Sequence, residues 1–185
     1  MTHRLVIVGY GTMGVTHRKK LAGIEGIEVG GAVDIDPVRE QYAAEDGLHV
    51  YPSLTDALAD ESTDFVFICT PNDSHRPIAE AALRAGKHVM CEKPAMLSSA
   101  EIEAVVALAE KKGLVFAVHQ NRRWDDDFLS IKELYDELDG PLGANADEAE
   151  KSVIEAARAV LAPSTTRTVA RAFAFLGPLQ ATFSL

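Results

Sequence analysis

Residues 6–17 read VIVGYGTMGVTH, an apolar run followed by three glycines and then a polar stretch. Gly9, Gly11 and Gly14 have the GxGxxG spacing and fall between a predicted strand and a predicted helix. In such a turn the first glycine permits the tight bend, the second lets the backbone approach a pyrophosphate, and the third lets the helix pack close to the strand. Glycine-rich turns are common, so an ordinary structural turn is the alternative.

The next strand favours the nucleotide interpretation. Asp34 ends the run 27–33 and lies 20 residues after Gly14. A carboxylate there would accept hydrogen bonds from the ribose hydroxyls and repel a 2′-phosphate, so NAD is expected in preference to NADP. The helix N-terminus would supply N–H groups to the phosphates. The alternative for Asp34 is a solvated helix-capping acid, and Arg39 is close enough in sequence to soften the cofactor discrimination.

Apolar runs without polar alternation are separated by amphipathic segments along the first 140 residues. The predicted strands span 4–8, 27–33, 49–51, 65–68, 88–91 and 114–118. The predicted helices span 12–22, a segment opening at Pro37, a brief segment capped by Ser53, then 77–85, a segment from Ser98 to 112, and 125–138. This pattern predicts an α/β fold with a doubly wound parallel sheet over residues 1–140. A short, mostly helical tail is expected over 141–185, with one helix near 145–160.

Composition excludes several classes of protein. The net charge of −10 disfavours nucleic-acid binding, and no apolar run reaches the ~18 residues of a membrane span. The first ten residues turn to glycine too soon for a secretory signal, so a cytoplasmic protein is expected. Cys69 and Cys91 are then expected to be buried, reduced thiols, with a regulatory disulfide as the alternative.

Two further motifs follow predicted strands. FICTPNDSH covers 67–75 and HVMCEKP covers 88–94, and ligands of open α/β sheets bind beyond the carboxyl ends of strands. Lys93 beside Glu92 is either part of such a site or a surface ion pair. The Lys93-Pro94 bond is a candidate cis peptide.

These stretches, together with AVDIDP and HQNRRWDDDFL, resemble the Gfo/Idh/MocA oxidoreductases over roughly residues 3–143. HQNRRWDDDF is similar to the branch that contains scyllo-inositol dehydrogenases. The resemblance implies an N-terminal Rossmann domain that binds NAD(P), with a sugar or cyclitol as the small-molecule substrate. A homo-oligomer is possible in this family.

By motif, the resemblance implies that Lys93 is the catalytic lysine, which takes the hydroxyl proton as hydride leaves the substrate. The remaining implied cofactor contacts lie in the glycine turn, at the ends of the later strands and in QNRRW. They are Gly9, Tyr10, Gly11, Thr12, Met13, Gly14, Asp34, Thr70, Pro71, Asn72, His75, Glu92, Pro94, Gln120, Arg122 and Trp124.

The chain departs from the family pattern after Gly143, where a substrate domain that contributes an Asp and a His is expected. The last histidine is His119. A nucleotide-binding module without turnover is therefore the alternative to an active dehydrogenase. His17 is expected to be a surface or packing residue, and no two histidines have a spacing that suggests a metal site.

Overall fold

A computed structural model describes residues 2–137 of the chain. The tail expected over 141–185, its helix near 145–160 and the domain boundary at 140 lie outside the described residues. Within 2–137, no helix is both long enough and apolar enough to cross a membrane.

Six parallel strands form one sheet in the order β3-β2-β1-β4-β5-β6. The strands are β1 (His3–Val8), β2 (Ile27–Val33), β3 (His49–Val50), β4 (Phe65–Ile68), β5 (His88–Cys91) and β6 (Phe116–Val118). The strand order reverses direction between β1 and β4. This is the doubly wound topology that the sequence predicts, with its switch point between those two strands.

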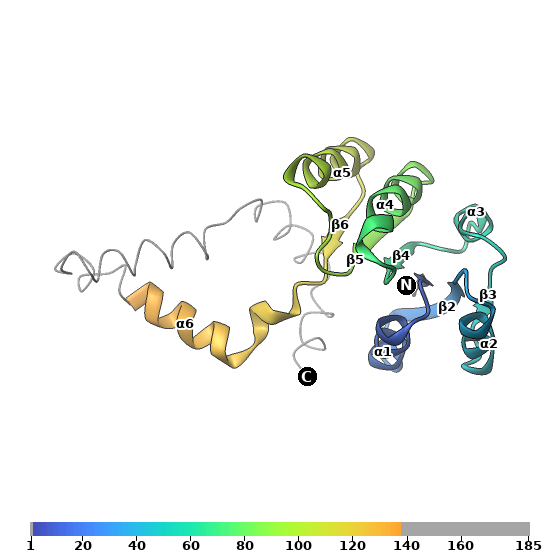
Figure 1. Ribbon diagram of the computed structural model, residues 1–185, viewed down its shortest axis with the longest axis horizontal. Coiled ribbons are helices and arrows are strands. Elements are labelled where there is room, and N and C mark those ends of the chain that lie inside the picture. The colour runs from blue at the N-terminus through green and yellow to red at the C-terminus, as the bar shows by residue number, and fades with distance from the viewer. Residues whose placement is uncertain (1, 138–185) are drawn as a thin grey trace.

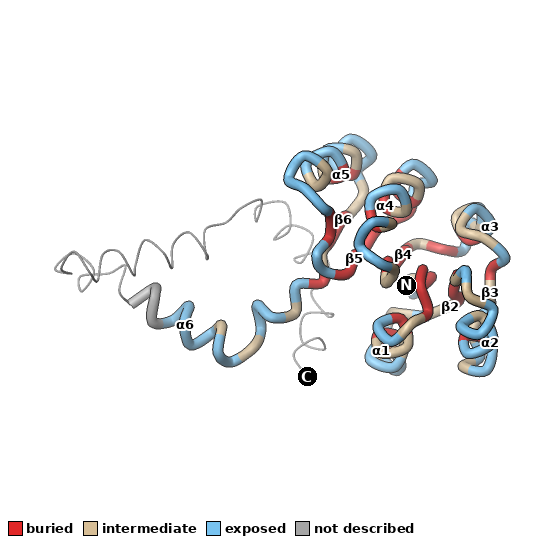
Figure 2. Tube along the Cα trace, in the orientation of Figure 1, coloured by how far each residue is buried: buried red, intermediate tan, exposed pale blue. Residues whose placement is uncertain are grey.

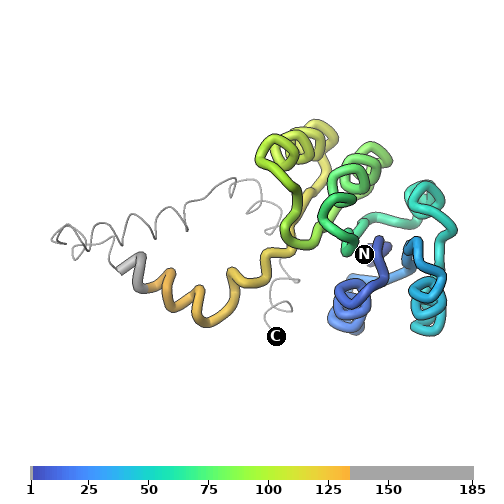
Figure 3. The backbone as a smooth tube through the Cα atoms, in the orientation of Figure 1, coloured from blue at the N-terminus to red at the C-terminus, as the bar shows by residue number. Residues whose placement is uncertain are grey.

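Helices cover both faces of the sheet. They are α1 (Thr12–Leu21), α2 (Pro37–Glu45), α3 (Leu54–Ala59), α4 (His75–Arg84), α5 (Ser99–Lys112) and α6 (Asp126–Glu137). α1 and α2 lie on one side of the strands, and α3, α4 and α5 lie on the other, whereas α6 extends away from the sheet (Figure 1). The backbone path in Figure 3 therefore passes from the sheet to a covering helix and back along most of its length.

Local sequence explains where several helices begin and end. The side chains of Asp36, Ser53 and Ser98 accept hydrogen bonds from backbone amides in the first turns of α2, α3 and α5. These are the N-caps expected of short polar residues. α5 ends at Gly113, whose φ of 65° is the left-handed conformation that glycine adopts without steric cost.

Both faces of the central strands are apolar because each packs against helices. Val6 and Val8 of β1 belong to the core under α3, α4 and α5, while Leu5 and Ile7 belong to the core under α1 and α2. Figure 2 shows the result, with buried strands enclosed between helices whose outer surfaces are exposed. Continuous apolar strands are what a sheet covered on both faces requires.

The observed elements differ from the sequence expectations mainly at their ends. α4 begins at His75, two residues before the expected start. β3 contains two residues, His49–Val50, where the sequence predicts a strand over 49–51. Two 3₁₀ helices were not predicted, η1 (Asn72–Ser74) and η2 (Asn121–Trp124). Both follow strands whose ends carry the motifs. In η1, Ser74 Oγ donates to Pro71 O at 2.7 Å, a local bond typical of short polar side chains.

Candidate nucleotide-binding site

The sequence motifs meet along the carboxyl edge of the sheet. The first residue after each of β1, β4, β5 and β6 donates its backbone N–H to a carbonyl at or near the end of a neighbouring strand. These bonds join Gly9 N to Val33 O at 2.8 Å, Cys69 N to Val8 O at 2.7 Å, Glu92 N to Ile68 O at 2.9 Å and His119 N to Cys91 O at 2.8 Å. Four segments far apart in the sequence therefore lie side by side where an open α/β sheet binds ligands.

Two of the three glycines are required by the fold itself. Gly9 has a φ of +93°, and a Cβ on it would lie 2.8 Å from the carbonyl carbon of Cys69. A Cβ on Gly14 would collide with the backbone oxygen of Gly9. The tight bend and the close helix packing expected from the sequence are thus both present.

Gly11 is different because the fold leaves space around it. A Cβ there would meet only the flexible guanidinium of Arg39, with Nη1 3.3 Å away. Gly11 is also the N-cap of α1, and it provides no side-chain hydrogen bond to the first turn, where no acidic residue stands. Thr12 and Met13 are exposed. The N-terminus of α1 therefore presents backbone N–H groups toward an open surface, an arrangement suited to an anion.

Asp34 is fixed beside this turn. Its side chain is only 4% exposed, Oδ2 accepts a hydrogen bond from Tyr10 N at 2.6 Å, and Oδ1 accepts one from Asp36 N at 3.0 Å. Asp36, rather than Asp34, caps α2 by accepting from Val38 N. The alternative that Asp34 is a solvated helix cap is therefore wrong, because its carboxylate ties the end of β2 to the glycine turn.

Tyr10 contributes to this region through its backbone. Its side chain is 1% exposed, packs in the core under α1 and α2, and donates from its hydroxyl to Asp46 Oδ2 at 2.7 Å. Burial, with help from this bond and the charge of Asp46, raises the pKa of Tyr10 above its usual range. Its phenol is therefore held in the core by Asp46 and is not exposed on the surface where a ligand contact is predicted.

Arg39 lies next to both Gly11 and Asp34. Its Nη1 is 3.9 Å from Asp34 Oδ2, its Nε is 3.6 Å from Asp36 Oδ2, and its side chain is half exposed. A half-exposed guanidinium thus lies beside the carboxylate expected to discriminate between cofactors. This is the proximity that the sequence suggested for Arg39.

The loop after β4 is joined to the loop after β5 by His75. Its imidazole is fully buried, with Nε2 2.8 Å from Thr70 O and Nδ1 3.1 Å from Pro94 O. Pro71 and Asn72 continue this loop into η1 with exposed side chains. His75 therefore connects two predicted site segments from inside the protein rather than lining an open channel.

Lys93 and Pro94 lie on the surface directly after β5. Both side chains are exposed, and the Lys93-Pro94 peptide is cis, as the sequence suggested. Glu92, the preceding residue, is only 5% exposed. The loop thus presents the lysine outward while its neighbouring carboxylate points into the protein.

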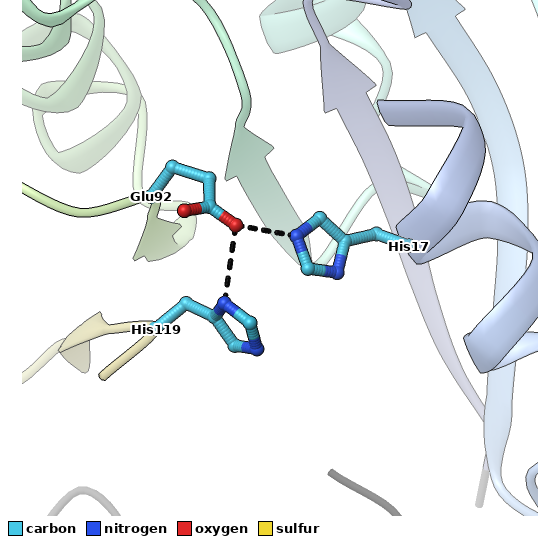
Figure 4. Close-up of side chains that lie close together, drawn as sticks. All are labelled: His17, Glu92 and His119. Carbon is cyan, nitrogen blue, oxygen red and sulfur yellow. Dashed lines mark hydrogen bonds and ion pairs between the residues drawn. The ribbon is translucent and has the colours of Figure 1, made fainter. Parts of the chain in front are cut away.

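Glu92 joins three segments of the site (Figure 4). Its Oε1 lies 2.5 Å from His17 Nε2 on α1 and 3.1 Å from His119 Nδ1 after β6, and its Oε2 accepts from Lys93 N at 3.0 Å. Burial alone would raise the pKa of the Glu92 carboxyl. Hydrogen bonds from His119, His17 and the Lys93 amide outweigh burial and hold that pKa well below its usual range. The carboxylate is therefore ionised.

His17 is neutral in this cluster. Burial lowers its pKa by disfavouring the imidazolium, and this effect outweighs the hydrogen bond to Glu92. With an ionised carboxylate as acceptor, Nε2 carries the proton and donates it. Nδ1 of His17 has no hydrogen-bond partner among the described residues.

The same three residue types also ligate metals, and their donor atoms all lie within 4.8 Å of one another. His17 and His119 both contact the single atom Glu92 Oε1 at hydrogen-bond distances. A shared acceptor explains that geometry directly. We therefore describe the group as a hydrogen-bonded cluster, hereafter the Glu92 cluster (His17, Glu92 and His119).

Gln120, Arg122 and Trp124 lie in and beside η2, all on the surface. Arg122 is 83% exposed at its side chain, and its Nη1 lies 2.6 Å from Asp125 Oδ2. Within residues 2–137, no hydrogen bond or ion pair joins these three side chains to the glycine turn or to the loop after β5. Their predicted roles at the nicotinamide or substrate remain predictions.

The sequence prediction missed His17. The sequence analysis expects a surface or packing residue there and does not connect His17 with Glu92 or His119, which lie 75 and 102 positions away in the chain. The available signal was positional, since His17 lies on the helix that follows the glycine turn, and His119 and Glu92 each follow a strand. Side chains at the ends of adjacent strands can meet a side chain of the helix that packs against them, even when the residues are far apart in the sequence.

Both cysteines are free thiols, Cys91 buried and Cys69 partly buried. Burial, reinforced by the charge of Glu92, raises the pKa of Cys91 to about 12 and also raises that of Cys69. Their reduced state agrees with the sequence expectation, and thiols with raised pKa values are poor nucleophiles.

The sheet order, the glycine turn at an open helix N-terminus and the acidic residue ending β2 define a Rossmann domain of the dinucleotide-binding type. Residues 3–120 match the model of the Gfo/Idh/MocA oxidoreductase family, described as an NAD-binding Rossmann fold. The chain belongs to this family.

Known proteins similar to the chain support this assignment. An NAD-binding protein from Listeria innocua is 47% identical, with a TM-score of 0.71 over 74% of this chain and 41% of that one. The uncharacterised oxidoreductase YdgJ of Escherichia coli is 38% identical over 76% of this chain and 40% of its own length. The scyllo-inositol 2-dehydrogenase (NADP(+)) IolW of Bacillus subtilis is 32% identical over 74% and 38%, respectively. The chain thus spans about two fifths of the length of these relatives.

Proposed function

We propose that the chain binds NAD(H) and forms the nucleotide-binding part of a dehydrogenase acting on a sugar or cyclitol. The observation that carries this proposal is the open surface at Gly11, where an uncapped helix N-terminus adjoins the fixed carboxylate of Asp34. Pyrophosphate suits the first feature and ribose hydroxyls suit the second. The name of IolW supports a cyclitol as the class of substrate.

Lys93 is proposed as the acid–base group. It is exposed at the end of β5, next to the carboxyl edge that the other motifs share. When bound, the nicotinamide supplies hydride transfer at its C4 position. Lys93 would take the proton of the substrate hydroxyl during oxidation and return it to the alkoxide during reduction.

NAD is proposed in preference to NADP. The ionisable side chain of Asp34 stands at the end of β2, where a 2′-phosphate would be held close to it. Arg39, 3.9 Å from Asp34 Oδ2, would partly offset the repulsion. Some binding of NADP is therefore expected, and IolW shows by its name that a relative uses NADP(+).

A second candidate is a nucleotide-binding module without turnover. The features at Gly11 and Asp34 require only a bound nucleotide, so they support this alternative as well. A panel of cyclitols and aldoses with NAD⁺ separates the two, since the module would bind NADH and turn over none of them.

Self-association and a cytoplasmic location of the protein stay predictions.

Titration of NADH, followed by its fluorescence, tests the proposal. Gly11→Val is expected to weaken binding about a hundredfold or more, because its side chain fills the space beside the helix N-terminus. Gly11 has a φ of −78°, which valine adopts, so the fold should survive, as circular dichroism would report.

Gly11→Ala is the matched control, because its methyl group meets only the movable Arg39 guanidinium. It should bind NADH more tightly than Gly11→Val and melt at nearly the wild-type temperature. Equal NADH affinity in wild type and Gly11→Val would refute the site.

A further inference from the structure

The Glu92 cluster lies on one side of the proposed cofactor. Asp34 lies at the end of β2 and is the proposed contact of the adenosine ribose. The adenosine half of the dinucleotide is therefore expected on the β2 side of the switch point between β1 and β4. A dinucleotide that crosses this point extends its other half over the ends of β4, β5 and β6. Glu92 and His119 are the first residues after β5 and β6. The cluster therefore borders the nicotinamide half, a placement that rests on the proposed function.

The cluster keeps a charge in a place sheltered from water. Glu92 is 5% exposed, and both of its oxygens accept hydrogen bonds, from two imidazoles and one backbone amide. Donors of this kind stabilise the ionised carboxylate without adding a counter-charge when the imidazoles are neutral. A buried charge interacts with nearby charges more strongly than an exposed one, because screening by water is reduced.

The two redox states of the cofactor differ in the charge of one ring. The nicotinamide ring of NAD⁺ is cationic, and the dihydronicotinamide ring of NADH is neutral. We infer that the buried carboxylate of Glu92 stabilises the oxidised cofactor relative to the reduced one, and that His17 and His119 are positioning residues that hold this carboxylate in place. Lys93 is unchanged when Glu92 alone is replaced, so the replacement measures the share of the carboxylate.

This role differs from a purely structural one in what it affects. A carboxylate that only fastens α1 and β6 to the loop after β5 would change the affinity for NAD⁺ and NADH equally. A charge next to the ring changes their ratio. The ratio of the two dissociation constants is therefore the informative quantity.

The experiment titrates NAD⁺ and NADH separately into the full chain by calorimetry at pH 8.5, where free imidazole, with a pKa near 6.5, is neutral. Glu92→Gln preserves shape and removes the charge. We expect Kd for NAD⁺ divided by Kd for NADH to rise about five- to tenfold, as a single charge at partly screened distances would produce. Glu103→Gln, the same change at an exposed position on α5, should leave the ratio unchanged.

Charge-conserving variants are matched controls for Glu92→Gln, because they disturb the cluster and keep its charge. Glu92→Asp and His17→Gln keep the carboxylate and are expected to keep the wild-type ratio, even where both affinities fall. A changed ratio in either of these variants, or an unchanged ratio in folded Glu92→Gln, would overturn the inference.

Two further outcomes distinguish a failure of the proposed function from a failure of the inference about Glu92. A wild type that binds neither NAD⁺ nor NADH refutes the proposed function, and the inference falls with it. A ratio that changes on addition of Zn²⁺ or EDTA would show that the cluster binds metal, which contradicts the assignment of the effect to the carboxylate charge. Independence from both additions supports it.

Discussion

The two ends of the candidate site are built by different means. On the β2 side, Gly9, Gly11 and Gly14 act through backbone conformation and the absence of side chains. On the β5 side, the Glu92 cluster acts through three buried side chains that meet from distant parts of the chain. The first end offers N–H groups to an anion, and the second holds an anion of its own.

The two ends match the charges expected along the proposed dinucleotide. Open backbone N–H groups suit the pyrophosphate, which is negative in both redox states. A buried carboxylate suits the end of the cofactor whose charge changes during reaction. Variants at the two ends are expected to differ in what they change, which is turnover, stability, the choice between NAD and NADP, or the dependence of stability on pH.

The largest effect is expected at the β5 end, on chemistry. Lys93→Ala should reduce turnover about a thousandfold, the scale of a lost acid–base group, while NADH affinity stays near that of wild type. Steady-state assays with a substrate found in the cyclitol and aldose panel, together with NADH titration, measure the two quantities.

Lys111→Ala, at an exposed position on α5, is the control and should retain full turnover. Undiminished turnover in Lys93→Ala would remove the lysine from the mechanism.

The next effect is on stability, at the β2 end. In a helix, alanine is favoured over glycine by about 1 kcal/mol. Gly14→Ala should nevertheless destabilise the protein by about 2 kcal/mol, because its methyl group collides with the backbone of Gly9. Urea unfolding followed by circular dichroism measures this change. A Gly14→Ala variant more stable than wild type would show that the close approach of α1 to Gly9 does not require glycine at position 14.

A smaller effect is expected on cofactor choice. Asp34→Ala should narrow the preference for NAD over NADP about tenfold, because the repulsion of a 2′-phosphate is lost. Asp34→Asn keeps an acceptor for Tyr10 N, so it should narrow the preference with less loss of stability. Competition binding with NADH and NADPH measures both, and an unaltered ratio in the two variants would exclude Asp34 from discrimination.

The smallest effect concerns pH. The pKa of His17 is lowered in the folded state, so the unfolded chain binds the extra proton as pH falls below about 6.5, and stability declines there. His17→Gln retains a donor for Glu92 and removes this proton, so its stability should decline less between pH 7 and 5.

His88, whose pKa is also lowered by burial, contributes to the same decline and remains in both proteins. Parallel urea titrations across the range test the prediction. Identical slopes for wild type and His17→Gln would contradict a neutral, buried His17.

The sequence predicted the backbone-built end of the site better than the side-chain-built end. β2, β4 and β5 have the predicted bounds, and Gly9 and Gly14 have the predicted roles, because strand periodicity and glycine conformations are local properties. The Glu92 cluster was not predicted, since its contacts depend on where tertiary packing places His17 of α1 relative to the residues that follow β5 and β6. The sequence also predicts cofactor contacts for Tyr10 and His75, but both side chains are buried, which depends on tertiary packing, and their contact with a cofactor stays a prediction.

The most direct test of the account follows backbone amide signals by ¹H–¹⁵N NMR while AMP or NADH is added to the full chain. AMP should shift the signals of Gly11 and Asp34 and leave those of Lys93 and His119 in place. NADH should shift all four, because it reaches from the β2 end to the Glu92 cluster. Shifts from NADH confined to Gly11 and Asp34, or absent from both ends, would contradict a single dinucleotide site along this edge.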